Sequence, residues 1–120
     1  MSLSCTWLNY EDEPILYNGE PLPDESLDNS LRLTGGFYGN SYASLIDSLI
    51  DQNSTLYNTH DFYMVKKIAD DLNFVFRWSK EKVIDELPDG YNYDEALSIA
   101  LMFKWYSEQN SELKCLSSWY

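Results

Sequence analysis

Residues 92–109 limit the fold more than any other stretch, because they predict one long helix that the other elements have to cover. Apolar residues recur there at steps of three and four, which is the spacing of one face of an α-helix. This face consists of Ala96, Ile99, Ala100, Phe103 and Tyr106. Further apolar residues make the face wide, namely Leu97, Leu101, Met102 and Trp105. A helix of this kind is contacted from several sides, so we expect it at the centre of the fold.

The start of this helix is predicted at Asn92. Asparagine is a favoured N-cap, and Glu95 stands three residues later, where its side chain can complete a capping box. Asp94 and Glu95 also suit the positive end of the helix dipole. The sequence therefore fixes the beginning of the central helix well.

The chain of 120 residues is long enough to bury a core and fits a single domain, residues 1–120. Apolar residues make up 44% and aromatic residues 16% of the sequence, which places the chain outside the disordered class in spite of its charge. We therefore expect a folded domain.

The charge of the chain is strongly negative and unevenly distributed. There are 20 acidic and 8 basic residues, for a formal net charge of −12. Residues 1–60 hold nine acidic residues and only one basic residue, Arg32, so this half alone has a net charge of −8. A negative surface repels phosphate groups, which argues against direct binding to nucleic acid or to an anionic membrane. The charge instead favours a basic protein surface as partner.

The two cysteines, Cys5 and Cys115, allow at most one disulfide, whereas small secreted domains usually have more. We therefore expect both thiols to be reduced. The sequence shows neither the pattern of a signal peptide nor about 18 consecutive apolar residues. These features predict a cytoplasmic protein with no membrane segment.

Two partly alternating stretches predict a small sheet. Residues 2–8 place Leu3, Cys5 and Trp7 on one side, and residues 113–119 alternate in the same way. We expect these two strands to pair, which would bring the two cysteines close together.

The region between the first strand and residue 40 gives weaker signals. Asn18-Gly19 is a typical hairpin turn, but Pro21 and Pro23 cannot donate ladder hydrogen bonds, so residues 14–23 fit an extended covering segment better. Residues 24–30 are acidic and polar, and residues 31–40 are interpreted as an extended piece that enters a glycine-rich loop.

Three more helices are predicted from apolar periodicity, over residues 41–53, from Asn58 or Thr59 to about residue 72, and over residues 79–87. Residues 74–78 fit either a continuation of the second of these helices or a strand. The predicted class is α+β and helix-dominated. Three to four helices surround the central C-terminal helix, and the N- and C-terminal strands form a small sheet; a mainly α fold is the alternative.

Few residues suggest chemistry. His60 is the single histidine and is expected at a helix start, where it is more simply a polar residue of the first turn than a general base or a metal ligand. The cysteines lack the close ligand pairs of zinc sites, and acidic residues are so abundant that some will meet by chance. Gly35–Ser41 precedes a predicted helix without a phosphate-binding motif. We predict no catalytic residue, no metal and no cofactor.

The function favoured by these features is that of a non-enzymatic protein–protein interaction module, of the inhibitor or immunity type, that docks on a basic partner. The candidate surface combines acidic and aromatic residues of the N-terminal half: Tyr10, Glu11, Asp12, Glu13, Tyr17, Asp24, Glu25, Phe37 and Tyr38. The alternative is a small ligand-binding or enzymatic domain with a pocket near Gly35–Ser41. A homo-oligomer is a further option, and the acidity can also serve solubility alone.

Overall fold

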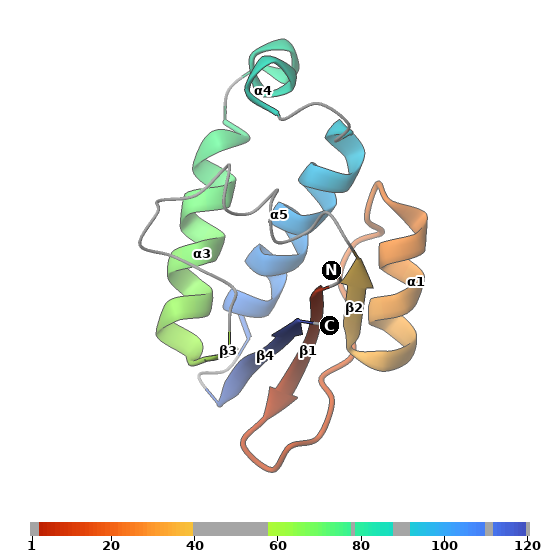
Figure 1. Cartoon of the computed structure of the whole chain (residues 1–120), viewed down its shortest axis with the longest axis vertical. Coiled ribbons are helices and arrows are strands. Elements are labelled where there is room, and N and C mark those ends of the chain that lie inside the picture. Colours follow the sequence, from red (N-terminus) through yellow and green to blue (C-terminus); the bar gives the residue numbers. More distant parts are fainter. Residues whose placement is uncertain (1–2, 40–57, 78, 88–91, 110–111, 120) are drawn as a thin grey trace.

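The computed structural model describes residues 3–39, 58–77, 79–87, 92–109 and 112–119, and the statements below concern these residues (Figure 1). The strands are β1 Leu3–Asn9, β2 Gly36–Gly39, β3 Asn58–His60 and β4 Leu113–Trp119. The helices are α1 Glu25–Thr34, α3 Phe62–Val75, α4 Lys80–Glu86 and α5 Tyr93–Ser107. The helix predicted over residues 41–53 lies outside the described residues.

The strands form one antiparallel sheet in the order β2-β1-β4-β3. The predicted pair of terminal strands is its centre, with Leu3 opposite Trp119 and Asn9 opposite Leu113. Short edge strands flank this pair on both sides. The helix-dominated α+β class is therefore confirmed over the mainly α alternative.

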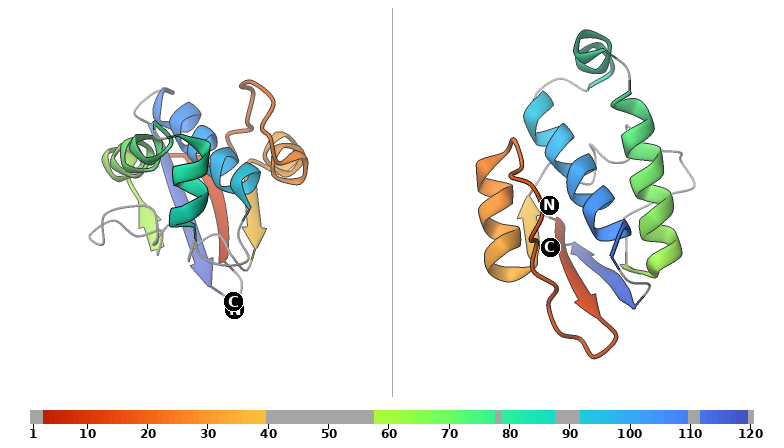
Figure 2. Two further views of the ribbon diagram at one scale, coloured as in Figure 1. Left: turned by 90° about the horizontal axis from the view of Figure 1, so that it is seen from above. Right: turned by 180° about the vertical axis from the view of Figure 1, so that it is seen from behind.

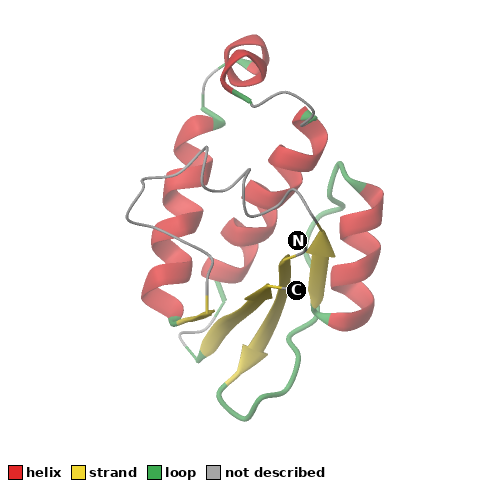
Figure 3. Ribbon diagram, in the orientation of Figure 1, coloured by secondary structure: helices red, strands yellow, loops and turns green. Residues whose placement is uncertain are grey.

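The helices α1, α5 and α3 lie side by side over one face of the sheet (Figure 2, left). Between these two layers lie the inward side chains of the central strands, Cys5, Trp7, Leu113 and Cys115, all of which are buried. The short helix α4 lies at the end of the α3–α5 pair that is farthest from the strands (Figure 3). The core is thus a single layer between helices and sheet.

Helix α5 has the central place predicted for it, since it contacts α1, α3 and α4. All five residues of its predicted apolar face are buried: Ala96, Ile99, Ala100, Phe103 and Tyr106. Trp7 of β1 stacks on Tyr106 at a centroid distance of 4.1 Å and meets Phe103 edge-on at 5.0 Å. Asn92 is the N-cap, and its Oδ1 accepts a hydrogen bond from the Glu95 N–H at 2.7 Å.

Helix α1 was not predicted, and the prediction of an extended piece that enters a glycine-rich loop is wrong over residues 31–39. Residues 31–34 are the end of α1, and residues 36–39 are strand β2. The Asp24 side chain caps the helix by accepting from the Leu27 N–H, and Gly35, at φ 72°, ends it in the left-handed conformation. Its buried face is only Leu27 and Leu31, so the apolar signal is short.

Two further boundaries differ from the prediction. Residues 58–60 form β3, paired with β4, so α3 begins after the N-cap Asp61 and not at Asn58 or Thr59. His60 consequently lies in a strand and not at a helix start. The stretch 74–78 continues α3 to Val75 and then turns at residues 76–77. The helical spacing of the apolar side chains therefore decides the structure of this stretch, and the strand-like alternation of residues 74–78 does not.

Candidate functional site

The turn after β1 carries the first four residues of the predicted interaction surface, Tyr10, Glu11, Asp12 and Glu13, and all four are exposed. Asn9 shapes this turn, because its Oδ1 accepts hydrogen bonds from the Glu11 and Glu13 N–H groups at 2.9 and 3.0 Å. The turn thus carries three neighbouring carboxylates, of which Asp12 pairs with Lys114 Nζ at 2.6 Å.

Two aromatic residues of the predicted surface are buried, which corrects their assignment. Tyr17 is 5% exposed, because its ring lies edge-on to Trp105 of α5 at 5.0 Å. Phe37 is 4% exposed, because it is on the inward face of β2. Tyr38 lies in β2, and its side chain is outside the described part of the structure. Among the aromatic side chains of the predicted set that the structure describes, the exposed one is therefore Tyr10.

The starts of α1 and α5 are joined and form an acidic corner, which consists of Asp24, Glu25, Asp94 and Glu95. The link is the buried Ser98, whose hydroxyl accepts from the Asp24 N–H and donates to the Asp94 carbonyl, both at 2.7 Å. Burial raises the pKa of Glu95 above its ordinary value, and the negative charge of Asp24 adds to the shift. Asp24 and Glu95 therefore lie close enough for their charges to interact.

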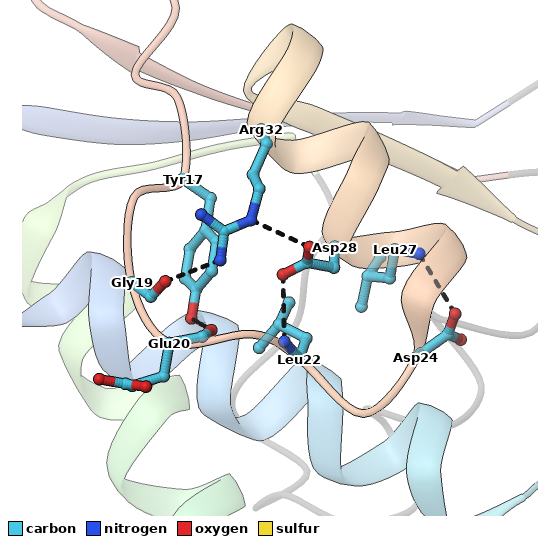
Figure 4. A network of polar contacts seen from close by, with 8 residues as sticks. All are labelled: Tyr17, Gly19, Glu20, Leu22, Asp24, Leu27, Asp28 and Arg32. Carbon is cyan, nitrogen blue, oxygen red and sulfur yellow. Dashed lines mark hydrogen bonds and ion pairs between the residues drawn. The ribbon is translucent and has the colours of Figure 1, made fainter.

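Between the acidic turn and the acidic corner, residues 17–22 form a loop that α1 holds in place (Figure 4). Arg32 donates from Nε to Asp28 Oδ2 at 2.9 Å and from Nη2 to the Gly19 carbonyl at 2.7 Å. The other carboxylate oxygen of Asp28 accepts from the Leu22 N–H at 3.0 Å. The ion pair of Asp28 with Arg32 thus binds the backbone of the loop at two places, Gly19 and Leu22.

The ion pair of Asp28 with Arg32 changes the pKa of Asp28 and also brings Arg32 into contact with Tyr17. The hydrogen bond from Arg32 is the main cause that lowers the pKa of Asp28 below its ordinary value. The Arg32 guanidinium also lies over the Tyr17 ring, 4.9 Å from its centroid. Tyr17 in turn donates its hydroxyl to the Glu20 carbonyl. Interactions of the loop's own side chains and of α1 therefore hold the loop in this conformation in the protein alone.

A loop–helix cleft of about 150 Å³ lies between this loop and α5. Its lining residues are Tyr17, Glu20, Pro21, Leu22, Leu101, Lys104, Trp105 and Glu108. Gly19 permits the close approach of loop and helix, because a Cβ at this position would lie 2.5 Å from Trp105 Cδ1. The floor is aromatic and aliphatic, whereas Glu20, Lys104 and Glu108 are exposed around it.

A larger groove of about 950 Å³ adjoins the cleft and shares Lys104 and Glu108 with it. The other lining residues are Lys66, Ala69, Asp70, Asp71, Asn73, Phe74, Arg77 and Ser107. Most of these side chains are charged or polar, and all but Ala69 are exposed or half-buried, whereas small-molecule sites are mainly apolar and enclosed. The groove is therefore an open surface trough between α3 and α5 and not a typical ligand pocket.

The arrangement offers little for catalysis. Within the described ranges, no group of three or more His, Cys, Asp or Glu side chains is placed to hold a metal ion. Glu95 has a raised pKa, but it lines neither the cleft nor the groove. The pocket predicted near Gly35–Ser41 does not coincide with either hollow, and Asn40 and Ser41 lie outside the described residues.

Comparison of the chain with protein-family models, with curated proteins and with solved structures finds no match in any of the three. Among the helices that the structure describes, none has the length and apolar character needed to cross a bilayer.

Proposed function

We propose that this chain is a protein–protein interaction module that docks on a basic surface of another protein. The observation that carries the proposal is the course of one segment, residues 10–25. It contains six acidic residues and no basic residue, and it runs from the acidic turn past the loop–helix cleft to the acidic corner (Figure 2, right). We call this segment, together with Asp94 and Glu95, the acidic face.

Electrostatics makes such a face suited to a basic partner. Complementary charge steers the encounter and raises the association rate, and its effect decreases as salt screens the charges. The exposed ring of Tyr10 lies beside the carboxylates of the turn and can supply a contact of the kind that anchors interfaces. The inhibitor or immunity type and the cytoplasmic location predicted from the sequence fit this proposal and remain predictions.

The competing explanation is that the charge serves only to keep the protein soluble. These two explanations differ in whether the position of the charge matters. Glu11→Gln with Glu25→Gln removes two charges from the acidic face, at exposed positions. Glu81→Gln with Asp85→Asn removes two charges from exposed positions on α4 and is the matched control.

The experiment is capture of proteins from an extract of the native host on immobilised wild type and on both variants, at low and at high salt, with identification by mass spectrometry. We expect a basic protein that is retained at low salt by wild type and by the α4 variant, and that is lost at high salt or with the face variant. Equal retention by all three proteins, or retention that ignores salt, contradicts docking through the acidic face. Light scattering over a range of concentrations tests the homo-oligomer separately.

A further inference from the structure

The loop–helix cleft has the size of one side chain. Pockets for drug-sized ligands and cofactors occupy roughly 300–1,000 Å³. The cleft measures about 150 Å³, and a cavity of about this volume holds a single benzene ring. By its size, the cleft therefore suits a single side chain of a partner protein, which we call the guest.

The lining of the cleft divides into an apolar floor and a charged rim. The floor is formed by the buried Tyr17 and Leu22 and by the half-buried Leu101 and Trp105. Aromatic faces and aliphatic groups of this kind contact the methylene stem of a long side chain and also attract a cation. The floor therefore suits a guest with an apolar stem and a cationic end.

The rim sets the sign of the guest's charge. Glu20 and Glu108 place two carboxylates there, and Lys104 places one ammonium group, so the rim has a net charge of −1. The wider acidic face adds negative charge on both sides of the loop along the segment 10–25. The Arg32 guanidinium also lies over the Tyr17 ring, but its charge is paired with Asp28. The charge of the rim and its surroundings is thus complementary to a cation, although Lys104 opposes it.

The cleft is also preformed. Arg32 and Asp28 bind the backbone of the loop at Gly19 and Leu22, so the loop does not have to be ordered when a guest enters. Preorganisation of this kind reduces the entropic cost of binding. The ion pair is therefore a positioning element for the cleft in addition to its part in the fold.

We infer that the loop–helix cleft receives one arginine or lysine side chain of the basic partner, with its stem on Tyr17 and Trp105 and its cationic end between Glu20 and Glu108. This inference depends on the proposed function, because it names the residue by which the partner is anchored. It goes further in assigning one site and one type of guest.

The test is NMR titration of the full-length ¹⁵N-labelled protein with blocked pentapeptides of sequence Gly-Ser-Xaa-Ser-Gly, in which Xaa is arginine, lysine or norleucine. The reporter is the indole N–H signal of Trp105, assigned by its loss in Trp105→Phe. We expect the arginine or the lysine peptide to shift this signal, and the norleucine peptide, which has the stem without the charge, to bind more weakly. The comparison of arginine with lysine identifies the preferred cation.

Two rim variants and one control variant on α4 make the test specific. Glu20→Gln with Glu108→Gln is expected to weaken the cationic peptide about two- to fivefold, the range of one exposed ion pair. Lys104→Ala is expected to tighten it, because a repelling charge is removed. Glu81→Gln with Asp85→Asn, which makes the same charge change on α4, is expected to leave it unchanged. Each variant is checked for unchanged folding by circular dichroism.

The outcomes that overturn the inference are distinct. Equal binding of the norleucine peptide means that the guest is apolar, weaker binding of the cationic peptides to Lys104→Ala means that the charge of the rim does not select a cation, and an unmoved Trp105 signal with every peptide means that the cleft takes no side chain. If a basic protein is captured through the acidic face while the peptides fail, the inference is wrong and the proposed function stands. If that capture is indifferent to salt or to the face variant, the proposed function fails as well.

Discussion

Replacement of Phe103 by alanine tests the packing around α5 most directly. Phe103 is fully buried, and its ring meets Trp7 edge-on at a centroid distance of 5.0 Å. Truncation of a buried phenylalanine costs about 3–5 kcal/mol, because apolar contacts are lost and a cavity remains. The edge-on pair with Trp7 adds about 0.5–1.5 kcal/mol to what burial alone gives, so we expect the upper half of that range.

The expected loss is large relative to the margin of a domain, which is about 5–15 kcal/mol. The entropy of unfolding is about 2.1 cal/mol/K per residue, or roughly 250 cal/mol/K for this chain, so a loss of about 4–5 kcal/mol lowers the melting temperature by about 16–20 °C. The assay is thermal and urea unfolding followed by far-UV circular dichroism. This signal does not depend on the fluorescence of Trp7, which the substitution itself alters.

Lys104→Ala is the matched control on the same helix. Lys104 follows Phe103 directly and is exposed, so its truncation is expected to change the free energy of unfolding by no more than about 0.5 kcal/mol. A melting temperature of Phe103→Ala within a few degrees of wild type would refute the register of α5 and the place of this helix in the core.

Two further predictions concern titratable groups. Because the pKa of Asp28 is lowered in the folded state, its pairing with Arg32 stabilises the protein above the unfolded pKa of about 3.9, and this stability is lost as the pH falls through the lower folded value. Asp28→Asn is therefore expected to be less stable than wild type at pH 7, with a difference in urea unfolding that shrinks below about pH 4; a difference that is constant with pH would contradict the pairing. The hydrogen bond with Cys5 and complete burial raise the pKa of the Cys115 thiol, so we expect alkylation by iodoacetamide at pH 8 to be far slower in native protein than in urea, as measured by mass spectrometry. Fast labelling of native protein would mean that the centre of the sheet is open.

The strongly periodic parts of the fold were predictable from the sequence. The buried face of α5 and the pairing of residues 3–9 with residues 113–119 follow from patterns that extend over seven residues or more. Helix α1 was missed because it buries only Leu27 and Leu31, although Asp24 before it and Gly35 after it are typical cap residues. The edge strands β2 and β3 have four and three residues, and strands this short are decided by the neighbours they pair with.

The candidate site was only partly predictable, since much of it depends on contacts between distant parts of the chain. The acidic residues 11–13, 24 and 25 were identified from composition, and they are at least partly exposed. The Asp28–Arg32 pair has the four-residue spacing of a helical ion pair, a signal that becomes readable only once α1 is assigned. The loop–helix cleft joins residues 17–22 to α5, and no local pattern indicates that they meet.

The position of β1 in the sheet also affects how the protein folds during its synthesis. The central neighbour of residues 3–9 is β4, residues 113–119, which is translated about a hundred residues later. Pairing across such a separation requires closure of a long loop and is slow compared with local contacts. Until β4 emerges, β1 can pair only with β2, and one edge of this strand stays open to other chains. A chain in which β4 has not yet paired with β1 is therefore more prone to aggregation than the complete sheet.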